Sequence, residues 1–198
     1  MLLKIDSGVY KIDLSSFFPF TFNSTHLLSC EAGICHYKLL AYLSSQLPVG
    51  AKVADFGTYF GDSAISLAYN SNVQVTTYDP NDNVGSGHYK LLPNITYCRR
   101  GATDVLTSVL DTMIIFVDIG NHESILEQRV LDFLITNAYK GIAIFDDIYL
   151  NDAMKKFWNS ITLTKYDVTE VGHGVNGTGA GTGVVVFDET SINVIVDI

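Results

Sequence analysis

Acidic residues directly follow two of the most apolar runs in the chain. Asp118 comes after the run 113–117, and Asp146 and Asp147 come after the run 141–145. If these runs are neighbouring parallel strands, the three carboxylates meet at one edge, where mutual repulsion raises their pKa values unless a cation compensates. Oxygen ligands in this number are typical of a site for Mg²⁺ or Ca²⁺. The sequence therefore predicts a divalent metal held by Asp118, Asp146 and Asp147.

A second candidate site lies in the stretch 53–68, VADFGTYFGDSAISLA, where two glycines follow an apolar run. Gly57 permits a sharp turn, and Gly61 allows a ligand close to the backbone where a helix begins. The dinucleotide fingerprint G-x-G-x-x-G is missing, so this stretch is poorly suited to bind a pyrophosphate. Asp79, after the next apolar run, is placed to bind ribose hydroxyls, although it could equally cap a turn before Pro80. This pairing suits S-adenosylmethionine better than NAD.

Short apolar runs alternate with segments of helical periodicity and would position these residues. Strands are expected at 52–56, 73–78, 95–98, 113–117 and 141–145, and helices at 33–47, 123–138 and 150–161. Such alternation predicts an α/β fold, a Rossmann-like, doubly wound and mostly parallel sheet whose ligands bind at the carboxyl ends of its strands. The runs 163–171 and 182–189 are joined by a segment too short for a crossover helix. They are expected to complete a seven-stranded sheet as a C-terminal antiparallel hairpin.

We expect one domain over residues 1–198, with an N-terminal extension (1–29), a core (30–188) and a tail strand (189–198). The N-terminal segment could form a hairpin about Asp6 to Gly8. The N-terminal segment and the tail could pair with each other, with the edge of the sheet, or with another subunit, so a homo-oligomer is compatible with the sequence.

Composition limits the partners of the chain. Twelve basic residues stand against 21 acidic ones, a net charge of −9, so a nucleic acid would meet net repulsion. No apolar run reaches the roughly 18 residues that a membrane span needs. The three cysteines form no C-x-x-C pair and the N-terminus shows no secretory signal, which favours a cytoplasmic protein.

The segments together resemble a known family. The stretch KVADFGTYFGDSAISLAY is similar to the first motif of class I S-adenosylmethionine-dependent methyltransferases, in their catechol O-methyltransferase-like branch. The segments ITYCRRGATDVL, MIIFVDIGNHE and KGIAIFDDIYL resemble the third, fourth and fifth strands of that family with the loops that follow them. EAGICHYKLLAYL resembles the helix before the first motif, so the match runs in order from about residue 30 to 188.

The resemblance implies S-adenosylmethionine as the cofactor. Its methionine end, ribose and adenine would be contacted by Asp55, Gly57, Thr58, Tyr59, Gly61, Ser63, Asp79, Ala102, Thr103 and Asp118. An ordinary strand-to-helix turn is the alternative interpretation of the two glycines.

The resemblance also implies a metal, because Asp118, Asp146 and Asp147 fall on the metal positions of the family. The metal would bind the hydroxyl oxygen of the acceptor, lower its pKa and orient it. The alternative is a site without metal, in which Asp118 contacts the cofactor or the substrate directly and Asp147 caps a helix that begins near Leu150.

His122 is the candidate general base, with Asp118 as the second catalytic residue. The lysine that catechol methyltransferase carries after the acid of the fourth strand is absent, and the sequence reads DIGNHE. Related sugar and small-molecule O-methyltransferases have an Asp-Gly-x-His-like stretch here, with a spacing that differs by one residue. A histidine can take a hydroxyl proton near neutral pH. His122 as a surface residue before a helix stays open as an alternative.

We therefore expect an S-adenosylmethionine-dependent methyltransferase that acts on a hydroxyl oxygen of a small molecule or sugar, assisted by a divalent metal such as Mg²⁺. A metal-independent methyltransferase and a non-catalytic S-adenosylmethionine-binding protein stay open as alternatives. A nicotinamide oxidoreductase is disfavoured by the glycine spacing.

Overall fold

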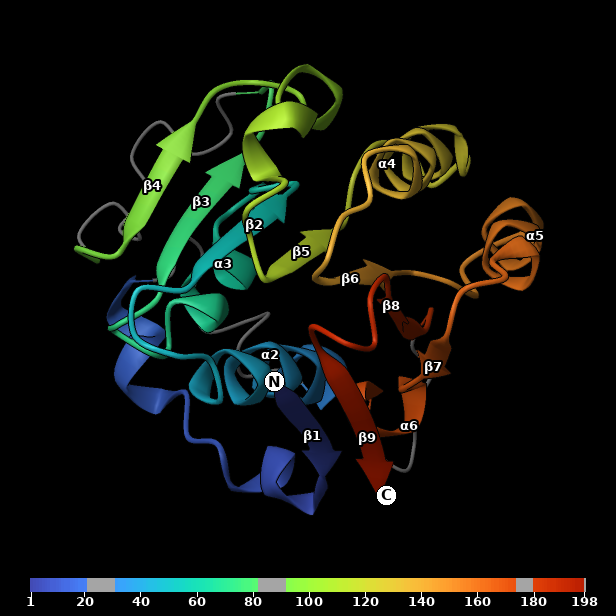
Figure 1. The fold of residues 1–198 in the computed structure, drawn as a ribbon. Coiled ribbons are helices and arrows are strands. Elements are labelled where there is room, and N and C mark those ends of the chain that lie inside the picture. Colours follow the sequence, from blue (N-terminus) through green and yellow to red (C-terminus); the bar gives the residue numbers. More distant parts are fainter. Residues whose placement is uncertain (21–30, 82–91, 174–179, 198) are drawn as a thin grey trace.

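A computed structural model of the chain describes residues 1–20, 31–81, 92–173 and 180–197 (Figure 1). Within these ranges seven strands form one sheet in the order β4-β3-β2-β5-β6-β8-β7. The strands are β2 (Lys52–Phe56), β3 (Gln74–Tyr78), β4 (Ile95–Cys98), β5 (Ile114–Val117), β6 (Ile142–Asp146), β7 (Lys165–Asp167) and β8 (Thr182–Val186). All neighbours are parallel except β8, which is antiparallel to both β6 and β7. The predicted doubly wound sheet and its C-terminal antiparallel pair are confirmed.

Helices cover both faces of the sheet (Figure 1). The helices α2 (Glu31–Ser45) and α3 (Asp62–Leu67) lie on one face, and α4 (Ile125–Thr136) and α5 (Asp152–Ser160) lie on the other. Side chains of β5 alternate between the two cores: Phe116 packs on the α2 side, and Ile115 and Val117 pack on the α4 side. Because both faces are covered, the strands read as continuous apolar runs.

The two ends of the described chain form a second, separate sheet. Strands β1 (Leu2–Asp6) and β9 (Asn193–Asp197) run parallel to each other on the α2 side of the molecule (Figure 1). Of the pairings left open for the termini, the structure has the one between them. The predicted hairpin at Asp6 to Gly8 is wrong, because the Asp6 carboxylate accepts a hydrogen bond from Gly8 N at 2.7 Å and starts the 3₁₀ helix η1 (Ser7–Lys11).

The predicted strand 163–171 is wrong in its second half. Strand β7 ends at Asp167, whose carboxylate accepts a hydrogen bond from Thr169 N at 3.0 Å, and helix α6 (Thr169–His173) follows. A side chain that bonds to the backbone two residues ahead turns the chain out of the sheet. A short 3₁₀ helix, η2 (Ser15–Phe20), precedes α2. In the described ranges, no helix has both the length and the apolar character that crossing a membrane requires.

Candidate functional site

A cavity of about 610 Å³ lies at the carboxyl ends of the central strands, where the strand order reverses between β2 and β5. This is where open α/β sheets bind their ligands, and the volume is that of a small-molecule site. Eight of the predicted residues line it: Gly57, Tyr59, Asp79, Ala102, Thr103, Asp118, His122 and Asp147. Five others are not in its lining: Asp55, Thr58, Gly61, Ser63 and Asp146.

The loop after β2 depends on its two glycines. Gly57 has φ +99°, and a Cβ at this position would lie 1.7 Å from the backbone oxygen of Asp118. Gly61 has φ +91° directly before α3, and its N–H donates to the Thr58 oxygen at 2.6 Å. Both positions favour a residue without a Cβ. The loop can therefore lie against the end of β5, which carries Asp118.

Asp55, in β2, is a fully buried carboxylate with a free acceptor. Its Oδ2 accepts a hydrogen bond from the Thr77 hydroxyl at 2.5 Å, and the Thr77 oxygen lies 2.6 Å from the Thr58 hydroxyl. Among the described residues, no hydrogen bond within 3.5 Å reaches Oδ1. Burial raises the pKa of Asp55 to about 7, and the hydroxyls of Thr77 and Ser63 act in the opposite direction. An unpartnered buried carboxylate oxygen suits a cationic donor such as an ammonium group.

Asp79 has backbone partners at both of its oxygens. Oδ2 accepts from Tyr59 N at 3.0 Å, and Oδ1 accepts from Asn81 N at 2.8 Å. The second bond closes a turn around Pro80, as the alternative interpretation expected, and the first ties the glycine loop to the end of β3. A carboxylate has about four acceptor positions, so these two bonds leave room for ribose hydroxyls.

Ala102 and Thr103 form the start of the 3₁₀ helix η4 (Ala102–Asp104) after β4. With Gly101 they line the cavity, as do Tyr78 and Asp79 at the end of the neighbouring strand β3. The predicted adenine and ribose residues therefore border the same cavity.

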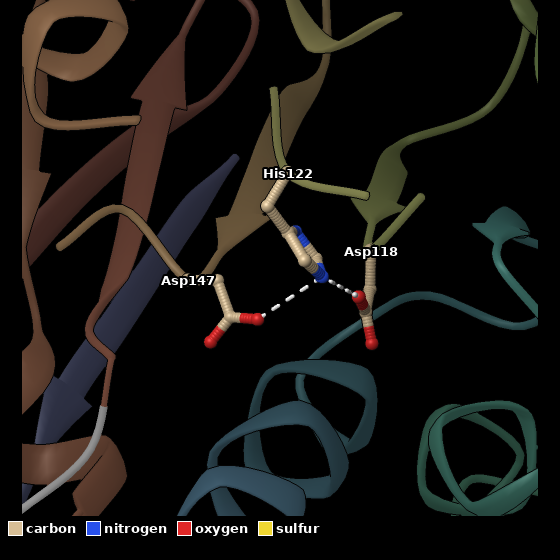
Figure 2. Close-up of side chains that lie close together, drawn as sticks. All are labelled: Asp118, His122 and Asp147. Atoms are coloured by element: carbon tan, nitrogen blue, oxygen red, sulfur yellow. Dashed lines mark ion pairs between the residues drawn. The ribbon is translucent and has the colours of Figure 1, made fainter. Parts of the chain in front are cut away.

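Three further residues of the cavity lining, Asp118, His122 and Asp147, lie close together (Figure 2). His122 Nε2 lies 3.7 Å from Asp118 Oδ1 and 3.2 Å from Asp147 Oδ2, and the three ligand atoms are all within 4.8 Å of one another. Asp118 follows β5, Asp147 follows β6, and His122 lies in the turn before α4. His122 and Asp147 both have positive φ, +54° and +57°, a conformation that ordinary residues keep only where the surroundings enforce it.

Asp146, the last residue of β6, lies beside a different set of partners. Its Oδ2 is 3.7 Å from His36 Nε2, and its Oδ1 accepts from the Thr182 hydroxyl at 3.3 Å. Strand β6 ends at Asp146, and Asp147 has a left-handed backbone conformation, so the two neighbouring side chains meet different partners. The three atoms that could share one ion therefore come from Asp118, His122 and Asp147, while Asp146 stands next to this group.

The acids interact as their spacing predicted. Burial raises the pKa of Asp118, the neighbouring charges of Asp146 and Asp147 raise it further, and His122 opposes this. Burial is also the largest cause of the raised pKa of Asp146, followed by the charge of Asp147. The cluster therefore resists full ionisation without a compensating positive charge.

Two alternatives from the sequence are wrong. Asp147 does not cap α5: the cap is Asn151, whose Oδ1 accepts from Ala153 N at 2.9 Å and Met154 N at 3.0 Å. His122 is not an open surface residue, because its side chain is 19% exposed and faces two carboxylates.

Two further residues contact His122 and were missed. The Glu127 carboxylate, in the first turn of α4, is buried and lies 3.8 Å from His122 Nδ1, and Asn151 Nδ2 donates to the His122 backbone oxygen at 2.8 Å. Asn151 carries a detectable signal, since an asparagine before a helical pattern is a typical cap. Glu127 has no signal of its own, because acids are common in the first turn of any helix.

The sequence matches no family model and no curated protein. Solved structures do resemble the fold. TomG, an O-methyltransferase from Streptomyces achromogenes involved in tomaymycin synthesis and solved with SAM, is 17% identical over 94% of this chain and 92% of its own, with a TM-score of 0.58. Cofactor-bound Rv0187 from MTB is 15% identical over 92% and 90%, also with a TM-score of 0.58. A cmcI structure with Mg and SAM is 14% identical over 91% and 84%, with a TM-score of 0.52.

At this level of identity the likeness concerns the fold. The chain has the Rossmann-like fold of class I S-adenosylmethionine-dependent methyltransferases, as its motifs predicted.

Proposed function

We propose that the protein is an S-adenosylmethionine-dependent methyltransferase that acts on a hydroxyl oxygen of a small molecule or sugar, with the help of a divalent cation. One observation carries the proposal. The same cavity at the switch point of the sheet is lined by the nucleoside-type residues Asp79, Ala102 and Thr103 and by the Asp118, His122 and Asp147 cluster.

The cofactor residues fit S-adenosylmethionine. Asp55 lies two residues before Gly57, which lines the cavity, and its buried Oδ1 has no hydrogen bond from the described residues, so its charge would favour the ammonium group of the methionine end nearby. Gly57 lets the loop pack directly against the backbone oxygen of Asp118, where the Cβ of any other residue would overlap. Asp79 would accept from the ribose, and Ala102 and Thr103 would border the adenine. Binding of SAM by TomG, which shares the fold, supports the assignment.

The acidic residues fit a cation. Asp118 and Asp147 offer carboxylate oxygens 3.7 Å and 3.2 Å from Nε2 of one imidazole, and the repulsion that helps to raise the pKa of Asp118 favours a positive ion beside these acids. Asp146 stands next to Asp118 and would be the third acid, as the sequence predicted. The cmcI neighbour was solved with both Mg and SAM, which supports this arrangement.

When bound, S-adenosylmethionine supplies the methyl group on a sulfonium, and the cation supplies positive charge beside the acceptor oxygen. With the cation held by the carboxylates alone, His122 Nε2, the ring nitrogen that faces Asp118 and Asp147, would be left to take the hydroxyl proton. The chain mainly holds the two reactants in line, and such alignment can lower a barrier by several kcal/mol. A cavity of about 610 Å³ is suited to a small acceptor next to the cofactor. The cytoplasmic location stays a prediction from composition.

The proposal is tested by calorimetry with S-adenosylmethionine and with NAD, each with and without Mg²⁺. We expect S-adenosylmethionine to bind and NAD not to bind. Asp79→Ala should weaken S-adenosylmethionine binding at least 10-fold, because the ribose loses its acceptor. Asp111→Ala is the matched control, since Asp111 pairs with Lys52 at the opposite end of β2. Binding of NAD alone would overturn the proposal.

The cation is tested by Mg²⁺ titration of two variants. Asp147→Asn should lose Mg²⁺ binding and Mg²⁺-dependent turnover, because an oxygen ligand loses its charge. His122→Gln should keep Mg²⁺ binding while turnover falls on the order of 10²-fold to 10⁴-fold, as expected for a lost general base. Full activity of the wild-type protein in the presence of a chelator would instead establish the metal-independent alternative.

A further inference from the structure

The turn that carries His122 has little support from its own backbone. Gly120, His122 and Ser124 all have positive φ, +70°, +54° and +67°. Within the described ranges, residues 119–123 take part in no backbone-to-backbone hydrogen bond outside regular elements. Among the described residues, the main chain of this turn is bonded by the side-chain amide of Asn151, which donates to the backbone oxygen of His122. Such a turn keeps one conformation only if neighbouring groups impose it.

Asn151 uses both ends of its side chain. Its Oδ1 accepts from the first N–H groups of α5, and its Nδ2 donates to the His122 oxygen at 2.8 Å. The first contact is an ordinary cap, which Asp or Ser could make equally well. The second requires the amide, because a carboxylate only accepts hydrogen bonds. Asn151 therefore ties the loop after β5 to the loop after β6, which carries Asp147 four residues earlier.

Glu127 contacts the same histidine from behind its ring. Its Oε1 lies 3.8 Å from His122 Nδ1, while Nε2 on the other side of the ring lies 3.2 Å from Asp147 Oδ2. Glu127 is 2% exposed, and its Oε1 has no hydrogen bond from the described residues. A buried carboxylate at this distance attracts a proton on Nδ1 and so favours the ring orientation in which Nε2 faces the opposite side.

We propose that Asn151 and Glu127 are positioning residues that hold His122 in the cavity, Asn151 by the main chain and Glu127 by the ring. This rests on the proposed function, in which His122 Nε2 takes the proton of the acceptor. The hydrogen bond of Asn151 sets the position of the histidine relative to Asp147, and Glu127 turns Nε2 toward the cavity. Neither residue lines the cavity itself.

The sharpest test is Asn151→Asp, which keeps the cap and the size of the side chain but removes the donor. We expect kcat to fall 10-fold to 100-fold. KM and the Kd for S-adenosylmethionine should stay within twofold of the wild-type values, and the denaturation midpoint should be unchanged. Asn137→Asp is the matched control. It removes the hydrogen bond of 2.8 Å that the Asn137 amide donates to the Phe133 backbone oxygen at the far end of α4, and it should leave kcat unchanged. Glu127→Gln should lower kcat in the same way, because the ring loses its charged partner.

A spectroscopic measurement separates this proposal from the proposed function. The imidazole ¹H–¹⁵N signals of His122, assigned by their loss in His122→Gln, should shift or broaden in Asn151→Asp and in Glu127→Gln, and stay unchanged in Asn137→Asp. This readout needs no turnover, so it decides the positioning even if the protein transfers no methyl group. Unchanged His122 signals and kcat in Asn151→Asp would overturn the proposal. A loss of kcat together with a lower denaturation midpoint and altered KM would also overturn it, because the role would then be structural.

Discussion

Asp55, Asp118 and Asp146 lie at the carboxyl ends of three adjacent strands, and burial raises the pKa of each. An acid that is easier to protonate when folded makes the folded state less stable as the pH rises. These residues are therefore costly for folding in the absence of a ligand. A bound ammonium group or cation would offset that cost, which links ligand binding to stability.

The sign of the effect can be measured at Asp55. Its pKa is about 7 in the folded protein against 3.8 for an ordinary Asp, so between about pH 4 and pH 7 the folded state binds a proton that the unfolded chain has released. The free energy of unfolding contributed by Asp55 therefore falls as the pH rises through this window. We expect Asp55→Asn to be more stable than wild type at pH 8, with a smaller pH dependence, in urea denaturation followed from pH 4 to pH 8.

Asp188 provides the opposite case as a control. Hydrogen bonds from Thr190 and Ser191 lower its pKa to about 2, so its contribution is present above pH 4 and lost as the pH falls toward 2. Asp188→Asn should thus lower stability at neutral pH and leave the slope between pH 4 and pH 8 unchanged. Parallel curves for wild type and Asp55→Asn would contradict the role of Asp55.

The loop after β2 contacts the end of β5 because the two strands that carry them are paired. Strands β2 and β5 pair in parallel up to Phe56 and Val117, and the chain must then turn away within the space beside Asp118. Gly57 makes this turn possible because it has no Cβ. A Cβ at this position would overlap the backbone oxygen of Asp118. The same loop carries Tyr59, whose N–H bonds to Asp79.

We expect Gly57→Ala to lower the free energy of unfolding by on the order of 3 kcal/mol, from backbone strain and from the overlap with Asp118. S-adenosylmethionine binding should weaken as well, because the loop has to move. Gly50→Ala is the matched control: Gly50 also has positive φ, +80°, but nothing lies within 4 Å of the added methyl. It should lose only about 1 kcal/mol, from the backbone conformation alone. Equal losses in the two variants, measured by denaturant titration, would show that the overlap is relieved elsewhere.

At the scale of the whole molecule, the two chain ends complete the core on the α2 side. Leu3 and Ile5 of β1 and Val194 of β9 are buried in the same hydrophobic cluster as Leu39 and Leu40 of α2. Their neighbours Leu2 and Ile195 are about half exposed, so the small sheet has one inner and one outer face. The terminal strands therefore stabilise the helix that backs the central sheet.

The matched pair Leu2 and Leu3 tests this role. Leu3→Ala should lower the free energy of unfolding by about 2 to 5 kcal/mol, the usual cost of truncating a buried leucine. Leu2→Ala, at a position 45% exposed, should change it by less than about 0.5 kcal/mol. Thermal or denaturant unfolding of both variants provides the measurement, and equal effects would mean that the β1 and β9 pair does not seal the core.

Much of the sheet follows from local patterns. Continuous apolar runs of four to six residues with helical segments between them predict buried parallel strands, and β2 to β6 lie at those runs. The patterns failed where a single side chain redirects the backbone. Asp6 starts a 3₁₀ helix instead of a hairpin and Asp167 starts α6 inside a predicted strand, because each bonds to a backbone N–H two residues ahead.

The residues that end the strands could be predicted from the sequence alone, since hydrophobic periodicity and the motif order are local properties. The sequence therefore placed Asp79, Asp118 and His122 near one another, and these residues line one cavity. The combination of side chains depends on the tertiary fold: His122 lies between Asp118 and Asp147, Asp146 lies beside His36, and Glu127 and Asn151 contact the histidine. The reason is physical, because side-chain direction depends on the φ and ψ of each loop and on the packing of elements far apart in the chain.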